Sequence, residues 1–262
     1  MQNLTIPQDL EEICIDEVSW RSGHRYFTLV TDLKSHKLIW VVEGRTTQAL
    51  DSFFTVLGKD YCARLKTVAI DMCEAYEVSI KKNCTVASIV YDRFHVVKML
   101  NEAVNEVRKE EIDKAAAKKK KLLRNTKWLI LTRESKLSTK QKNFLDELCA
   151  ENKNIHKAVV FKELFMSIYQ FPDPPLAEKH LIQCIVEAYQ SGLAPLKKFA
   201  EFINRRKQGI MNWYFTKRTT SVSEGINNVV KTLRRSAYGY KNPNYFKLKI
   251  LQKCGNLQIL PI

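Results

Sequence analysis

The stretch that decides the fold is Ala87-Ser88-Ile89-Val90-Tyr91-Asp92-Arg93-Phe94-His95. Its first half is an apolar, β-branched run typical of a buried strand, and its second half leads into the helical pattern that starts at Val96. Asp92 and His95 are therefore expected where a strand becomes a helix, an edge at which α/β folds collect their chemistry. A simpler interpretation stays open, in which Asp92 only caps the helix and His95 is satisfied in its first turn.

Toward the N-terminus, the pattern predicts three strands, a helix, a fourth strand, a second helix and then the strand that runs into Asp92. The ranges are 13–19, 26–31 and 37–44 for an antiparallel meander, 46–58 for a helix, 67–70 for a strand and 74–82 for a helix. This order is that of an α/β, ribonuclease-H-like (retroviral-integrase-like) fold, with a mixed five-stranded sheet flanked by helices. In that topology the first and fourth strands are neighbours, so Asp16 and Asp71 are expected at one edge of the sheet.

Toward the C-terminus, no strand is predicted between Val96 and about Gly209, and an all-helical insertion is expected to interrupt the sheet. Its helices are predicted at 96–123, around 144–148 behind a capping box from Ser138 to Gln141, and at 155–169, 175–189 and 195–207. One more helix, 221–235, follows the insertion. The expected domains are 10–105 for the first part of the core, 106–210 for the insertion and 211–255 for the completion of the core.

Composition favours one large soluble protein with a polyanionic partner. The chain has 262 residues, 43 Lys and Arg against 28 Asp and Glu, and a formal charge of +15. Charge alone does not separate DNA, RNA and anionic membrane. No signal peptide and no apolar run of about 18 residues is evident, so a cytoplasmic protein is expected. Seven scattered cysteines without a C-x-x-C pair indicate reduced thiols.

The candidate chemistry rests on Asp16, Asp71 and Glu224. Three hard carboxylates suit Mg²⁺, or Mn²⁺ in its place, and two such ions can promote in-line phosphodiester cleavage. Each residue also has a structural interpretation. Asp16 could close a strand or pair with Arg21, Asp71 could cap the following helix, and Glu224 could complete a capping box with Ser221.

Taken together, the motifs of this sequence resemble those of the DDE class of bacterial insertion-sequence transposases. The resemblance covers residues 10 to 250, and no single motif carries it alone. The motifs are Cys14-Ile15-Asp16-Glu17, Ala69-Ile70-Asp71-Met72, Asp92-Arg93-Phe94-His95, Glu224-Gly225-Ile226-Asn227-Asn228 and Arg234-Arg235-Ser236-Ala237-Tyr238-Gly239.

The resemblance implies a metal-dependent enzyme that cleaves DNA strands at transposon ends and transfers them to a target. Asp16, Asp71 and Glu224 would be both the catalytic residues and the metal ligands, with Mg²⁺ as the cofactor. Asp92 and His95 would match a supporting signature after the second aspartate. Members of the family usually carry an N-terminal zinc-binding and helix-turn-helix region, which is not evident here, so a separate end-recognition protein is a possible partner. A homo-oligomer on DNA is expected.

Basic residues are the expected DNA contacts. Lys231, Arg234 and Arg235 continue the helix of Glu224 and are well placed to hold phosphates near the metal site. A second set is Arg205, Arg206 and Lys207. The run from Lys118 to Lys121 is either a solvated helix end or a DNA contact, and Trp128 and Trp213 are either core residues or stacking platforms for unpaired bases.

Two other functions stay open on the sequence alone. One is a ribonuclease-H-like nuclease that does not transpose. The other is a non-catalytic or truncated DNA-binding remnant of a transposase.

Overall fold

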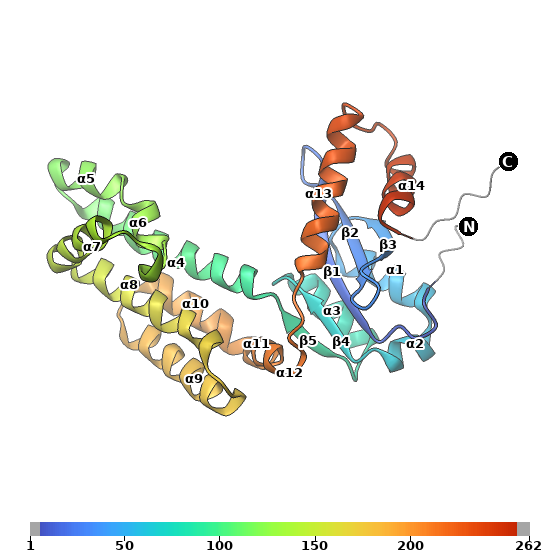
Figure 1. The fold of residues 1–262 in the computed structure, drawn as a ribbon, viewed down its shortest axis with the longest axis horizontal. Helices are drawn as coiled ribbons and strands as arrows, with labels where there is room; N and C mark the ends of the chain where they lie inside the picture. The colour runs from blue at the N-terminus through green and yellow to red at the C-terminus, as the bar shows by residue number, and fades with distance from the viewer. Residues whose placement is uncertain (1–5, 256–262) are drawn as a thin grey trace. The chain divides into compact units, whose positions relative to one another are not determined.

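The protein is represented by a computed structural model that describes residues 6–255, apart from the side chains of Lys118 and Lys119. The chain forms two compact units (Figure 1). The sheet unit contains the chain up to Asp92 and again from Phe215, and the helical unit is Arg93–Tyr214. The sequence pattern divided the chain at 105/106 and 210/211. The structure places the boundaries at 92/93 and 214/215. The first lies earlier than predicted because the helix that starts at Arg93 packs on other helices of the helical unit.

The sheet unit has the predicted ribonuclease-H-like topology. Its five strands lie in the order β3-β2-β1-β4-β5, with β1 in the centre. β2 runs antiparallel to both of its neighbours, β1 and β3, whereas β4 and β5 run parallel to β1. The elements are β1 (Glu12–Arg21), β2 (Arg25–Asp32), β3 (Leu38–Glu43), α1 (Thr47–Leu57), α2 (Lys59–Arg64), β4 (Thr67–Ile70), α3 (Glu74–Asn83), β5 (Ser88–Tyr91), α13 (Ser221–Ser236) and α14 (Pro243–Cys254).

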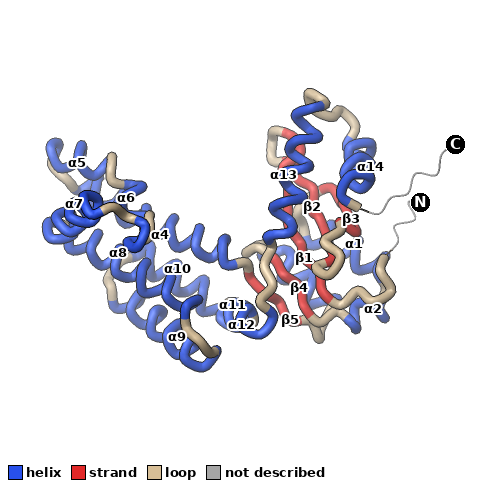
Figure 2. The backbone as a smooth tube through the Cα atoms, viewed as in Figure 1, coloured by secondary structure: helices blue, strands red, loops and turns tan. Residues whose placement is uncertain are grey.

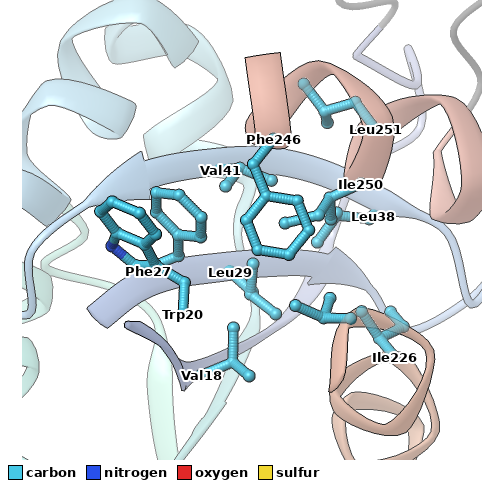
Figure 3. Packing of buried hydrophobic residues seen from close by; sticks show 11 residues of the cluster. Val18, Trp20, Phe27, Leu29, Leu38, Val41, Ile226, Phe246, Ile250 and Leu251 are labelled. Atoms are coloured by element: carbon cyan, nitrogen blue, oxygen red, sulfur yellow. The ribbon is translucent and has the colours of Figure 1, made fainter. Parts of the chain in front are cut away.

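Helices cover both faces of the sheet. On one face, Ile226 and Val230 of α13 and Phe246 and Ile250 of α14 pack with strand residues in one buried cluster, at one end of which the rings of Trp20 and Phe27 stack (Figure 3). On the other face, α1 and α3 pack on the alternate side chains of the same strands. There Phe53 lies 5.9 Å from Trp40, centroid to centroid, and the Tyr76 hydroxyl lies 2.8 Å from that of Thr28.

Local side chains and a glycine define the ends of these helices. The Thr46 hydroxyl accepts a hydrogen bond from the Ala49 amide at the start of α1, and Gly58 ends that helix at φ +87°, a conformation that favours glycine. Asn242 caps α14 in the same way by accepting from the Asn244 and Tyr245 amides. The chain therefore enters and leaves these helices at positions that the sequence specifies.

The helical unit consists of helices and loops in its described residues (Figure 2). The predicted capping box between Ser138 and Gln141 is confirmed at the start of α7. The elements are α4 (Arg93–Lys114), α5 (Ala117–Arg124), α6 (Lys127–Leu131), η1 (Glu134–Lys136), α7 (Thr139–Glu151), α8 (Lys153–Met166), η2 (Ser167–Gln170), α9 (Pro174–Gln190), α10 (Ala194–Arg205), α11 (Lys207–Met211) and α12 (Trp213–Thr216).

The long helix predicted for 96–123 is wrong in one respect: it breaks between Lys114 and Ala117. Ala116 takes an extended conformation, with ψ 159°. The chain then packs back on α4, where the buried guanidinium of Arg108 donates to the Leu123 carbonyl at 2.9 Å. This tertiary contact outweighs the helix propensity of the alanines.

Candidate active site

Three aspartates follow one another across the parallel strands of the sheet unit. Ile15 of β1 pairs with Ile70 of β4, and Ile70 pairs with Tyr91 of β5. Ile15, Ile70 and Tyr91 are followed in the sequence by Asp16, Asp71 and Asp92, respectively. The Asp92 amide continues this alignment by donating to the Ile70 carbonyl at 3.0 Å. The sheet register thus places three carboxylates in one row at its edge.

Asp16 is held by α13 across the sheet face. It is 7% exposed. Its Oδ2 accepts a hydrogen bond of 2.8 Å from the Asn227 side-chain amide, and its Oδ1 accepts one of 2.7 Å from the Glu17 backbone amide. The Asn227 amide also lies 3.4 Å from the Glu17 carbonyl. The Asn227 side chain of α13 and the Glu17 backbone amide therefore both help to orient this carboxylate.

Glu17 lies beside Asp71. Burial raises the pKa of Glu17, and the neighbouring Asp71 carboxylate raises it further, whereas Arg45 lowers it. Arg45 donates to Oε1 of Glu17 at 3.2 Å, and the buried Oε2 has no hydrogen-bond partner among the described residues. Asp71 itself accepts from the Cys73 amide at 2.9 Å. Two carboxylates that lie this close favour a cation or a proton between them.

Cys14 lies on the same face of β1 as Asp16, since alternate residues of a strand face one way. Its thiol is 2.9 Å from the Ser223 hydroxyl of α13. Burial is the main cause of its raised pKa, and Asp16, Asp92 and Asp71 raise it further. A buried thiol with a raised pKa stays protonated and is a poor nucleophile, so the role of Cys14 is to pack β1 against α13.

Glu224 lies between the two contacts that α13 makes with β1. It follows Ser223, which contacts Cys14, and precedes Asn227, which contacts Asp16, by three residues. Residues three apart share one face of a helix, so Glu224 and Asn227 lie on the same side of α13. The Glu224 side chain is exposed, in the first turn of the helix. The capping-box interpretation with Ser221 is wrong, because the N-cap is Thr220 and Ser221 is already helical.

The oxygen ligands fit a divalent cation in their chemistry. Asp16 and Asp71 carry hard oxygen donors at the ends of paired segments on adjacent strands, and the buried Glu17 carboxyl group lies beside Asp71. Over residues 6–255, no three side chains of the His, Cys, Asp and Glu types lie together as a metal-binding group.

The first set of basic residues lies along α13. Lys231 and Arg235 are exposed, and Arg234 is half-buried and donates to the Ser19 carbonyl of β1 at 3.3 Å. They follow Glu224 on one helix by 7 to 11 residues, or about 10 to 17 Å at 1.5 Å per residue. One helix therefore carries an acidic first turn and a basic second half.

The second basic set lies in the helical unit, where two of its members have structural contacts. Arg206 is buried, with its guanidinium 4.0 Å from the centroid of the Phe202 ring. Lys207 forms a salt bridge of 3.4 Å with Glu178. Arg205 is the exposed member of the set.

The signature from Asp92 to His95 spans the boundary between the two units. Asp92 is buried in the sheet unit, in the row described above. Arg93 begins α4, and its guanidinium lies 4.6 Å from the centroid of the Tyr169 ring. Phe94 is exposed and meets the His95 ring edge-on at 5.6 Å.

Two contributors to the site were not predicted. Asn227 was quoted only as part of a motif, although its position three residues after Glu224 puts it on the same helix face. Glu17 follows Asp16 directly, so strand alternation puts it on the opposite face of β1. Its proximity to Asp71 arises because Asp71 lies beyond the end of β4.

Among known proteins, this chain matches a family model described as "Transposase", of the DDE class and the ISL3 type, over residues 13–250. It is 33% identical, over 244 residues, to the transposase for insertion sequence element IS1001 of Bordetella parapertussis. It is 22% identical, over 277 residues, to the transposase for insertion sequence element IS1557 of Mycobacterium tuberculosis. The alignments cover 92% and 97% of this chain but only 60% and 62% of those two relatives.

Transposases of this class act on DNA and generally use divalent metal ions. The structure adds that no helix in the described part of this chain is long and apolar enough to cross a membrane. The family match, the order of the motifs and the ribonuclease-H-like sheet agree with one another. The chain therefore belongs to the ISL3-type family of DDE transposases.

Proposed function

We propose that this chain is the catalytic part of a DNA transposase that cleaves DNA strands at the ends of an insertion sequence and transfers them to a target. The observation that carries the proposal is the contact between Asn227 and Asp16. It joins the helix of Glu224 to the strand that lies in register with Asp71, although these residues are far apart in the sequence.

In this proposal Asp16, Asp71 and Glu224 bind divalent cations, with Mg²⁺ as the natural ion and Mn²⁺ as a substitute. Bound ions of this kind lower the pKa of an attacking hydroxyl and stabilise the leaving oxygen of a phosphodiester. Asn227 orients Asp16 through its hydrogen bond, and Glu17 supplies a further carboxylate beside Asp71. Asp92 supports the row from the neighbouring strand, and His95 follows it at the start of α4.

The basic half of α13 would hold the DNA backbone beside the carboxylates. Lys231 and Arg235 are exposed cations on the helix that carries Glu224, so phosphates bound there lie within about 17 Å of the third carboxylate. Arg234, which is tied to β1, would order that surface, and Arg205 would add a contact on the helical unit. Such contacts are independent of base sequence, so target choice would need further elements. We propose a homo-oligomer on DNA and a separate end-recognition protein or region as partners.

The test is metal-dependent nicking of duplex DNA that carries the ends of the element, followed by a strand-transfer assay. Asp16→Asn, Asp71→Asn and Glu224→Gln are each expected to abolish both reactions and to leave DNA binding intact. Asp60→Asn and Glu74→Gln are matched controls at exposed positions of the same unit, and they are expected to keep activity. Unchanged nicking by any of the first three variants would remove that residue from the site.

The two assays also separate the alternatives. Nicking without strand transfer would indicate a nuclease. DNA binding without either reaction, over a range of Mg²⁺ and Mn²⁺ concentrations, would indicate a non-catalytic remnant.

A further inference from the structure

The most concentrated positive charge of the chain lies in the helical unit, outside the site described above. From Lys114 to Arg133 the sequence has eight Lys and Arg and neither Asp nor Glu. This stretch contains α5 and α6, which we call the α5–α6 hairpin (residues 117–131). Such a run is an electrostatic footprint for a polyanion when it is displayed on an ordered surface.

The α5–α6 hairpin is ordered by two buried cations on its inner side. The Arg108 guanidinium donates to the Leu123 carbonyl at the end of α5, at 2.9 Å. The Lys162 ammonium, which is fully buried, donates to the carbonyls of Ile130 and Thr132 at the end of α6, at 2.8 and 2.6 Å. These contacts satisfy carbonyl groups that helix ends leave open. The hairpin is therefore a fixed part of the helical unit.

The outer side of the α5–α6 hairpin presents exposed cations that are not paired with the carboxylates of the described residues. Lys121, Arg124 and Lys127 are exposed, and none of them forms a salt bridge with any residue of the described chain. Lys121 and Arg124 share a face of α5 because residues three apart are neighbours on a helix surface. The buried Leu123 marks the inner side of the same helix. Several of the remaining surface cations are paired, for example Lys114 with Glu111 and Lys207 with Glu178.

Trp128 stands beside these cations. Its side chain is 74% exposed, whereas Trp20 is buried at 2% and Trp40 and Trp213 are half-buried. The Lys127 ammonium lies 5.0 Å from the centroid of the Trp128 ring. Trp128 lies four positions after Arg124, so their Cα atoms are at most about 14 Å apart. An exposed indole beside cations offers a flat face on which a nucleic-acid base can stack.

From these observations we infer that the α5–α6 hairpin binds unpaired DNA, with Lys121, Arg124 and Lys127 on phosphates and the Trp128 indole stacked on a base. Cations next to an exposed aromatic ring are the combination that single-strand binding requires, because phosphates and base faces are displayed together only when the strand is unpaired. A duplex offers the phosphates but hides the base faces. The inference rests on the proposed function for the identity of the nucleic acid as DNA.

The test uses the full chain with Glu224→Gln, in EDTA, so that binding is measured without chemistry. Fluorescence anisotropy gives the affinity for a labelled single-stranded oligonucleotide and for the corresponding duplex. Trp128→Ala is expected to weaken single-strand binding about 5- to 100-fold and to change duplex binding little. In the parent protein, the oligonucleotide is expected to quench tryptophan emission, and Trp128→Phe is expected to remove most of that quenching.

The charge contribution is measured with a triple variant, Lys121→Gln, Arg124→Gln and Lys127→Gln. It is expected to reduce the slope of log affinity against log salt by about 2, since each phosphate contact on a single strand contributes about 0.7. The matched control removes the same charge from exposed lysines of α8, α9 and α10, in Lys153→Gln, Lys179→Gln and Lys198→Gln, and is expected to keep the slope.

Two results would overturn the inference. One is equal single-strand affinity for the parent, Trp128→Ala and triple variants. The other is a loss of single-strand affinity in the triple variant but not in Trp128→Ala, together with an equal loss when polyglutamate competes for the parent protein. That result would indicate a general polyanion surface. Failure of the proposed function gives a different result. If the chain never nicks DNA but Trp128→Ala and the triple variant weaken single-strand binding as expected, the inference stands without the proposed function. If the chain nicks DNA and neither variant changes single-strand binding, only the proposed function stands.

Discussion

The hydrogen bond from Asn227 to Asp16 gives the sharpest quantitative prediction, and Asn227→Ala is the perturbation. The wild-type amide donates to a carboxylate oxygen at 2.8 Å, on a residue that is 7% exposed. Loss of a hydrogen bond to a charged group costs about 1.5–3 kcal/mol of unfolding free energy. Alanine is the better helix former by about 0.6 kcal/mol, so the net loss expected is about 1–2.5 kcal/mol.

The next residue supplies the control. Asn228 is exposed on the same helix, and Asn228→Ala makes the same chemical change with the same gain in propensity. It is expected to leave the stability unchanged or to raise it by about 0.6 kcal/mol. Urea denaturation followed by circular dichroism measures both variants. Hydrogen exchange of peptides from β1 and α13 shows whether the loss lies in the sheet unit. Equal stabilities for the two variants, within about 0.5 kcal/mol, would refute the role given to Asn227.

Three further predictions concern stability. Hydrogen bonds from Lys82, Ser79 and Asn83 lower the pKa of Asp51, so the contribution of its carboxylate to the unfolding free energy is complete above the unfolded pKa of about 3.9 and is lost as the pH falls through the lower folded value. Asp51→Ala should therefore lower the unfolding free energy by about 1–3 kcal/mol in urea titrations at pH 7, and the difference from wild type should shrink toward pH 3. Phe246→Ala should cost about 3–5 kcal/mol by the same assay, because the ring is fully buried in the core of the sheet unit, whereas the exposed Tyr245→Ala should change stability by less than about 1 kcal/mol. Lys162→Ala should cost at least about 2 kcal/mol, seen as faster exchange of α6 amides, since it leaves two carbonyls without their donor; unchanged exchange would contradict the capping role.

The sheet was predictable because its signals are local and repeated. Alternation and β-branched runs define the strands, and the fourth strand was predicted with the bounds observed, Thr67–Ile70. The order of elements then sufficed to put Asp16 beside Asp71. The break between α4 and α5 was not predictable in this way, because alanines favour a continuous helix, whereas the hydrogen bond from Arg108 to the Leu123 carbonyl forms only when the chain folds back on α4.

The two capping-box patterns show the same limit. Ser138 and Gln141 form the predicted box, whereas Ser221 and Glu224, with the same spacing, do not. The difference lies before the second pattern, where the helix starts one residue earlier, after Thr220. The pattern identified a helix start in both cases, but only the packing of α13 on β1 decides which residue is the cap and leaves Glu224 with an exposed carboxylate.

The surroundings of the site were the least predictable part. Strand alternation separates Glu17 from Asp16, so no periodic pattern brings Glu17 to Asp71. The contact arises from the turn that follows β4, where the Asp71 side chain accepts from the Cys73 amide. Contacts of this kind depend on where a strand ends to within one residue, which is the least certain feature of any sequence pattern.

The insertion of the helical unit into the sheet unit has a consequence for how the protein is made. Asp71 leaves the ribosome 153 residues before Glu224, an interval of about 8–30 s at common elongation rates. During that time the strands exist without α13 and α14, so the hydrophobic face around Phe27 has no cover and Asp16 has no Asn227. A nascent or prematurely terminated chain thus carries Asp16 and Asp71 without Glu224. The order of synthesis itself delays assembly of the proposed site until the sheet unit can fold as a whole.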